Sequence, residues 1–200
     1  MNTFPKGKVA FFVTTNIHKF NEAQLVFAKY KIATAMLKIE AVEIQHDNLE
    51  NIAKASAIDA VEKCGLPIIV EDAGLFIKHL NGFPGPYSSY VYRTIGNKGI
   101  IKLMGKIRER NAYFQSVVAF HSPEEKSPRC FHGKVEGKIS HEERGTGSFG
   151  FDPIFEPFKL STRKAGNKTF GEMTLKEKNR HSHRAQALQK FVKWYKEDFK

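Results

Sequence analysis

Three short apolar segments in the first 70 residues, separated by two helix-like segments, restrict the fold of this chain most strongly. Lys8–Val13 (KVAFFV) is almost entirely apolar, which is typical of a strand buried on both faces of a sheet. Residues 32–39 and 66–70 have the same character. Between these segments, residues 17–30 and 49–64 carry apolar side chains near helical spacing. The alternating order predicts an α/β fold whose sheet has a parallel portion.

The remainder of the chain predicts more strands in the same sheet. Residues 81–87 (NGFPGPY) form a dense turn cluster, and residues 88–107 are predicted to be helical with an interruption near Gly96. Residues 113–121 and 129–140 are predicted to form an antiparallel hairpin, and a last helix is expected over residues 182–194. We expect a single domain over residues 1–200, with a mixed sheet, helices on both sides and a second lobe built from the later strands.

The charge of the chain indicates an anionic partner. Lys and Arg number 32 against 21 Asp and Glu, a net charge of +11, and residues 101–200 hold 21 of the bases and 12 of the acids. Such a surface would suit nucleic acid, an anionic membrane or a polyphosphate ligand. The alternative is a solvated basic surface that binds no partner. No run approaches the ~18 apolar residues of a membrane span, and residues 1–8 lack the apolar core of a secretory signal. We therefore expect a cytoplasmic protein that does not bind membranes.

The first polar cluster follows the first predicted strand. Its residues are Thr14, Thr15, Asn16, Ile17, His18 and Lys19. A strand-to-helix turn presents unpaired backbone N–H groups and the positive end of the helix dipole, which together bind anions. The hydroxyl groups and the lysine suit phosphate, although ordinary helix capping would use the same residue types.

The second cluster is the acidic pair Glu71-Asp72, predicted to lie where the strand 66–70 ends. Ligands of open α/β sheets collect at the carboxyl ends of strands. Two adjacent carboxylates repel each other unless a cation or a base compensates. Oxygen ligands of this kind suit Mg²⁺, and Glu43 is a candidate second ligand. The alternative is a solvated pair that opens a turn.

Two later clusters complete the set, one suited to a planar ring and one, over residues 177–184, suited to an anion. In the first, residues 147–153, Phe149 or Phe151 could stack on the ring, Asp152 could accept hydrogen bonds from its edge, and Gly150 would allow a close approach. A core aromatic followed by an Asp-Pro turn is the alternative. In the second, His183 and Arg184 would lie in the first turn of the last helix, where positive charge is unfavourable unless it holds an anion. Together, the four clusters predict a nucleotide site.

The clusters also resemble a known family. The sequence is similar to the inosine triphosphate pyrophosphatase family, and to its archaeal members most of all, over about residues 8–195. The motifs that carry the resemblance, all in family order, are T-x-N-x-x-K at 14–19, VEDAGL at 70–75, GFPGPYS at 82–88, FGFDPIF at 149–155, KTFGEM at 168–173, and EKN at 177–179 followed by SHR at 182–184.

The resemblance implies hydrolysis of ITP, dITP and XTP to the monophosphate and pyrophosphate by a homodimer of two-lobed subunits. These subunits have a long central mixed sheet and an active-site cleft between the lobes. The implied cofactor is Mg²⁺, which Mn²⁺ can replace. Carried over residue by residue, the resemblance makes Asp72 the general base and a metal ligand with Glu43, and makes Glu71 their support. The implied phosphate contacts are Thr14–Lys19 and Lys54. The implied ring pocket consists of Phe149 with Gly150, Phe151 and Asp152. The implied donors to the 6-oxo edge are Lys178, His183 and Arg184.

Two departures from the family pattern stand out. Ala73 replaces the usual Ser or Thr after the aspartate, so a hydroxyl contact to the substrate is missing, and Gly171 replaces the more frequent Ala. A nucleic-acid-binding module is the rival from another class, but the carboxylates Glu43, Glu71 and Asp72 would repel a phosphate backbone. A sibling pyrophosphatase for modified pyrimidines or damaged purines is the closer rival.

Overall fold

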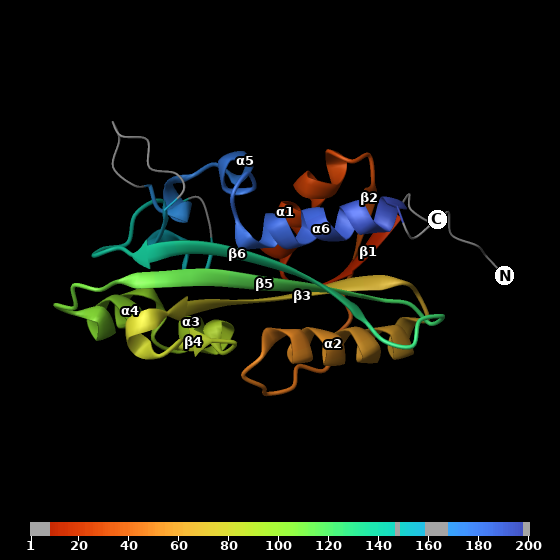
Figure 1. Ribbon diagram of the computed structural model, residues 1–200, viewed down its shortest axis with the longest axis horizontal. Helices are drawn as coiled ribbons and strands as arrows, with labels where there is room; N and C mark the ends of the chain where they lie inside the picture. Colours follow the sequence, from red (N-terminus) through yellow and green to blue (C-terminus); the bar gives the residue numbers. More distant parts are fainter. Residues whose placement is uncertain (1–8, 147–148, 159–167, 198–200) are drawn as a thin grey trace. The chain divides into compact units, whose positions relative to one another are not determined.

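The computed structural model describes residues 9–146, 149–158 and 168–197 (Figure 1). Its strands are β1 (Val9–Val13), β2 (Ala33–Leu37), β3 (Ile68–Ile77), β4 (Pro84–Gly85), β5 (Asn111–His121), β6 (Arg129–Ile139) and β7 (Phe155–Pro157). Its α-helices are α1 (Ile17–Ala28), α2 (Leu49–Cys64), α3 (Ser88–Thr94), α4 (Gly96–Met104), α5 (Leu175–Lys178) and α6 (His183–Glu197). Short 3-10 helices cover Lys78–Leu80, Asp152–Ile154 and Phe170–Glu172.

All of these strands belong to one mixed sheet. The order is β2-β1-β3-β5-β6-β7, and the short β4 pairs with β3. Strand β1 is parallel to both β2 and β3, whereas β4 is antiparallel to β3 and β7 is antiparallel to β6. Neighbours β5 and β6 are joined by residues 122–128 alone, which is too short a connection for a parallel crossover. The predicted mixed α/β fold is confirmed.

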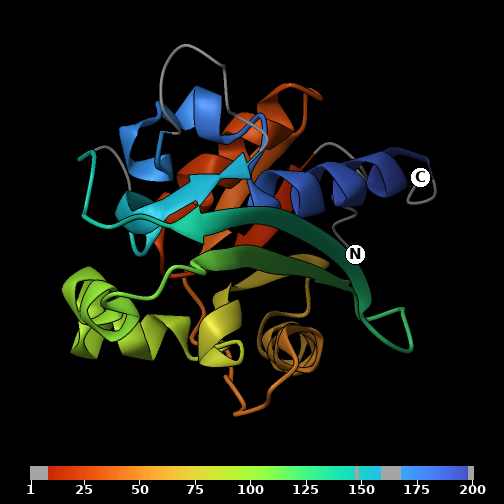
Figure 2. The ribbon, with the colours of Figure 1, turned by 60° about the vertical axis from the view of Figure 1, so that its left-hand side comes forward.

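The chain divides into two compact units, and the long strands β3, β5 and β6 contribute residues to both. The first unit comprises residues 1–72, 116–133 and 184–200. Here α1 and α6 cover one face of the sheet and α2 covers the other (Figure 1 and Figure 2). Phe12 from β1, Phe27 from α1 and Phe191 from α6 are completely or almost completely buried in one apolar core.

The second unit comprises residues 73–115 and 134–183. A separate apolar core unites Leu75 of β3, Phe114 of β5 and Ile139 of β6 with Ile100 of α4. Phe155 and Phe170 complete this core from the segments that follow β6. Each unit therefore has a core of its own.

Local sequence signals account for the ends of several elements. Helix α2 has the predicted bounds because Asn48 caps its first turn through a bond to the Glu50 amide, and Gly65 ends it at φ 64°. The predicted interruption near Gly96 is confirmed, since α3 ends at Thr94 and α4 begins at Gly96. The basic residues at positions 159–167, and Lys8, lie outside the described part of the chain.

The end of the third predicted strand was placed wrongly. The sequence placed Glu71-Asp72 after a strand ending at Val70, but β3 continues to Ile77, so the pair lies within the strand. The strand can continue because Glu71 is buried against compensating charges, described below, instead of entering solvent. Among the described helices, none is long and apolar enough to cross a membrane.

Candidate active site

The segment between β1 and α1 caps the helix. Asn16 is the N-cap residue, and its Oδ1 accepts hydrogen bonds from the backbone N–H groups of His18 (2.9 Å) and Lys19 (3.2 Å). Thr14 Oγ1 accepts a bond from the backbone N–H of Asn16 at 3.1 Å. Thr15, Ile17 and His18 are exposed. The capping alternative is therefore present in the structure, and the phosphate contacts stay a prediction.

Lys19 joins this helix to strand β3. Its Nζ donates to the backbone oxygen of Glu71 at 2.7 Å and lies 3.1 Å from Oε2 of the same residue. The ammonium group remains partly exposed, whereas the Glu71 side chain is fully buried. The arrangement fixes a positive charge beside the acidic pair while leaving part of it accessible.

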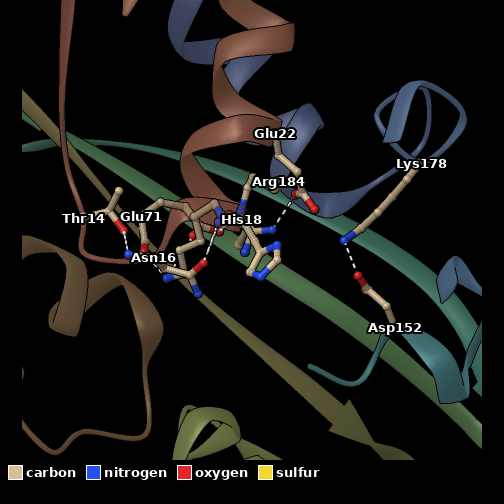
Figure 3. Close-up of polar contacts among 10 residues, drawn as sticks. Thr14, Asn16, His18, Glu22, Glu71, Asp152, Lys178 and Arg184 are labelled. Carbon is tan, nitrogen blue, oxygen red and sulfur yellow. Dashed lines mark hydrogen bonds and ion pairs between the residues drawn. The ribbon is translucent and has the colours of Figure 1, made fainter. Parts of the chain in front are cut away.

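Glu71 is the centre of a buried charge network (Figure 3). Ser116 Oγ donates to Glu71 Oε1 at 2.5 Å, and Arg184 Nε lies 3.1 Å from the same oxygen. Arg184 Nη1 also donates to Glu22 Oε2 at 2.5 Å. Lys19 and Arg184 thus balance the two carboxylates, as buried charges require. These contacts hold the Glu71 side chain in place, and its supporting role toward a metal stays a prediction.

The same network explains how a positive charge is tolerated at the start of the last helix. Arg184 lies in the first turn of α6, where the helix dipole opposes positive charge. Burial lowers the pKa of Arg184, but Glu71 and Glu22 outweigh that effect and raise it overall. The anions that hold this arginine are therefore carboxylates of the protein itself.

Asp72 differs from its neighbour. It is partly buried, and within the described residues its carboxylate forms neither a hydrogen bond nor an ion pair. Burial raises the pKa of Asp72 to about 6; the Lys19 ammonium opposes the rise, and the carboxylates of Glu71 and Glu43 add to it. A carboxylate with a pKa near neutrality can accept a proton during a reaction.

The same carboxylates suit a divalent cation. Glu43 is exposed in the segment between β2 and α2, and it lies close enough to Asp72 to raise that residue's pKa. A cation would relieve this repulsion, and two carboxylates are the usual protein contribution to a Mg²⁺ site shared with substrate phosphates. Across the described ranges, no three His, Cys, Asp or Glu side chains are grouped to hold a metal by themselves.

Lys54, a predicted phosphate contact, is engaged elsewhere on α2. Its Nζ lies 2.5 Å from Oε1 of Glu50, one helical turn earlier. His132 Nε2 lies 3.0 Å from the other oxygen of the same carboxylate. Lys54 is 39% exposed and could exchange this surface partner for a phosphate, because such pairs contribute little stability.

The second unit brings together several residues predicted to contact a ring. The Lys178 ammonium pairs with the Asp152 carboxylate, and both side chains are buried (Figure 3). Lys178 Nζ also lies 4.9 Å from the centroid of the Phe149 ring. Phe149 is only partly buried, whereas Phe151 is a core residue whose ring packs edge-on against Tyr92 at 5.5 Å. Of the two aromatic candidates, only Phe149 has a surface that could receive a ligand.

His183, another predicted donor to the ring, is buried in the second unit. Its ring stacks on Phe114 with centroids 4.6 Å apart and planes 10° from parallel. This contact fixes the orientation of the imidazole from one side.

Comparison with known proteins identifies the family. Residues 10–194 match the Ham1 family. The chain belongs to this family. It is 45% identical over 185 residues to a protein of Methanopyrus kandleri named dITP/XTP pyrophosphatase, covering 92% of this chain and 95% of the relative. It is 44% identical over 189 residues to a Thermococcus kodakarensis protein of the same name, covering 94% and 98%.

Solved structures agree with the sequence relatives. A HAM1 protein from Coxiella burnetii has a TM-score of 0.80 and 27% sequence identity, covering 94% of this chain and 98% of that one. The predicted resemblance, its archaeal emphasis and the fold class are thereby confirmed.

The two departures from the family pattern have different structural settings in this Ham1 chain. Ala73 lies in β3 directly after Asp72. Gly171 is packed so tightly that an added Cβ would lie 2.5 Å from the carbonyl oxygen of Arg144 and 2.9 Å from Cα of Pro153. Glycine at position 171 is therefore required by this backbone, whereas Ala73 presents no hydroxyl group at its position in β3.

Sequence reasoning missed three residues that contact candidate site residues or their backbone. Glu22 lies on the buried face of α1 with Ala23 and Val26. An acidic residue on the apolar face of a predicted helix indicates a buried charge that needs a partner. Ser116 and Asn97 gave no comparable signal, because small polar residues are common in strands and at helix ends. Only their tertiary partners reveal them.

Proposed function

We propose that this Ham1 protein hydrolyses dITP, XTP and ITP to the nucleoside monophosphate and pyrophosphate. One observation supports the proposal most: beside Lys19 and the buried Glu71, Asp72 carries a carboxylate that has a pKa of about 6 and that forms no hydrogen bond or ion pair among the described residues. The archaeal relatives named dITP/XTP pyrophosphatase match the chain over nearly its whole length. A general base next to a fixed cation is what hydrolysis of a phosphoric anhydride requires.

The proposed reaction is a displacement at the α-phosphorus. A water oxygen forms the new bond to this phosphorus, and the bond to the oxygen that bridges it to the β-phosphorus breaks. The released water proton passes to Asp72, and pyrophosphate leaves with the bridging oxygen. Lys19 and Lys54 neutralise charge on the phosphate oxygens, and the positive end of the α1 dipole adds to their effect.

A Mg²⁺ ion, or Mn²⁺ in its place, would be held by Glu43 and Asp72 and would supply charge neutralisation at the phosphate oxygens. Glu71 is suited to positioning instead of ligation, because Ser116, Arg184 and Lys19 occupy its carboxylate. Its contacts keep the strand in place next to Asp72.

The specificity for oxo purines is assigned to the second unit and the start of α6. Phe149 would stack on the base, with Gly150, Phe151 and Asp152 shaping the pocket, and Lys178, His183 and Arg184 would act as donors. A 6-oxo group accepts hydrogen bonds, whereas the amino group of adenine donates them, so donors at this edge disfavour ATP. Discrimination of this kind reaches ~10⁴-fold where buried groups are left unpaired.

The test is pyrophosphate release from ITP, XTP, dITP, ATP, GTP and dUTP, each with and without Mg²⁺. Turnover of ITP, XTP and dITP but not of ATP, lost on chelation, is the expected result, and GTP, which shares the 6-oxo group, reports discrimination at position 2 of the ring. Equal turnover of ATP would contradict the specificity residues but not the phosphate chemistry. Preference for dUTP would favour the sibling pyrophosphatase, and no release from any nucleotide would refute the proposal. We also propose that the protein forms a homodimer and is located in the cytoplasm. Analytical sedimentation tests whether the homodimer forms.

A further inference from the structure

Asn97 is a buried polar residue of the second unit that neither the family motifs nor the proposed chemistry includes. It is 7% exposed and lies at the start of α4. Its Nδ2 donates to the backbone oxygen of Gly150 and to Oε2 of Glu143, both at 3.2 Å. Both partners are acceptors, so the orientation of the amide is fixed by its donor end.

The Gly150 carbonyl belongs to the turn that holds the ring-contacting residues. Gly150 has φ +65°, a conformation that favours glycine, and the backbone N–H of Asp152 bonds to the Phe149 oxygen across it at 3.4 Å. On one side of the turn, Phe149 reaches Lys178; on the other, Asp152 pairs with the same ammonium. Gly150 therefore lies in the turn that links the two residues contacting Lys178.

A second contact holds the turn from the same side. Tyr92 of α3 packs edge-on against the ring of Phe151, with centroids 5.5 Å apart. Asn97 and Tyr92 thus attach the turn to α3 and α4 through its backbone and through a core ring.

We infer that Asn97 is a positioning residue for nucleobase recognition. Its amide holds the Gly150 carbonyl, and through it the turn that presents Phe149 and Asp152. The inference rests on the proposed function, because it concerns the ring half of that site. It requires that loss of the amide donor weaken binding of the base while leaving the phosphate contacts in the first unit unchanged.

The test is Asn97→Asp, which keeps the side-chain shape and replaces the donor by an acceptor. The matched control is Asn81→Asp, the same exchange at an exposed position of the second unit. Steady-state kinetics with dITP give kcat and KM, and calorimetry gives the affinities for dIMP and for pyrophosphate alone. We expect Asn97→Asp to raise KM and the dissociation constant of dIMP roughly tenfold, with kcat and pyrophosphate affinity within about twofold of wild type.

A second variant guards against loss of folding. In Asn97→Asp the new carboxylate faces Glu143, so Glu143→Gln in that background removes the like-charge contact while the bond to Gly150 stays broken. The double variant is expected to keep the raised KM, and a KM within twofold of wild type would overturn the inference. Equal losses of dIMP and pyrophosphate affinity in the folded double variant would also overturn it, since they indicate general damage. Absence of dITP turnover by the wild-type protein would instead refute the proposed function, and the inference with it.

Discussion

Arg184 Nη1 lies 2.5 Å from Glu22 Oε2, and the two residues are 162 positions apart in the chain. The pair joins the first turn of α6 to α1, and both side chains are at most 3% exposed. Arg184 continues to Glu71, so one guanidinium connects a helix near the start of the chain with the strand that carries Asp72.

Replacing this arginine should cost much stability. Arg184→Met leaves the carboxylates of Glu22 and Glu71 buried without their common partner, and we expect the free energy of unfolding to fall by about 3–5 kcal/mol. Urea denaturation followed by circular dichroism measures the loss. Lys63→Met, which removes the exposed pair with Asp59, is the control and should change stability by less than about 1 kcal/mol. Equal effects of the two substitutions would contradict the network.

Ser116 should matter for both stability and turnover. Ser116→Ala removes the hydroxyl that donates to the buried Glu71 carboxylate, at an expected cost of about 1–3 kcal/mol. The freed carboxylate would also alter the setting of Lys19, so kcat for dITP should fall. Chemical denaturation and initial rates provide the two readouts, with Ser89→Ala at an exposed position for comparison. A variant as stable and active as wild type would show that the bond is dispensable.

Asp72→Asn separates catalysis from stability. We expect turnover to vanish and nucleotide binding to persist, because the amide cannot accept the water proton. The raised pKa means that the folded state favours the neutral carboxyl, so this residue's contribution to stability is lost as pH rises from about 4 to 6. At pH 7.5 in chelator the variant should therefore be more stable than wild type by about 1–2 kcal/mol.

Thermal melts across this pH range test the stability effect of Asp72→Asn. Asp47→Asn, at an exposed position, should show no such gain. Turnover at the wild-type rate in Asp72→Asn would exclude Asp72 as the base.

Lys178 should control selection of the base. Lys178→Met removes the partner of the buried Asp152 and a predicted donor to the 6-oxo edge. We expect kcat/KM for dITP to fall at least tenfold, about 1.4 kcal/mol, while the value for dATP changes little. Lys176→Met lies at an exposed position of the same short helix and should leave the ratio unchanged. The double variant Lys178→Met with Asp152→Asn removes the unpaired charge, so a restored dITP preference there would contradict the donor role.

Much of the architecture could be read from the sequence because it depends on local signals. The apolar run before Thr14, the cap Asn48 and the stop at Gly65 are properties of short segments, and β1 and α2 appear where they were expected. The family motifs likewise located Asp72, Phe149 and Lys178 in order along the chain. Their roles toward a substrate stay predictions that the experiments above address.

What surrounds those residues was decided by tertiary structure alone. Glu71-Asp72 resembled the end of a strand because adjacent carboxylates normally enter solvent, but long-range partners at Ser116 and Arg184 allow β3 to continue to Ile77. The sequence placed Arg184 among donors without indicating that Glu22 and Glu71 hold it, and it gave no sign of the Asn97 contact to Gly150. The free energy of a buried charge or amide depends on the groups that fold against it, and no local pattern specifies which distant side chains those are.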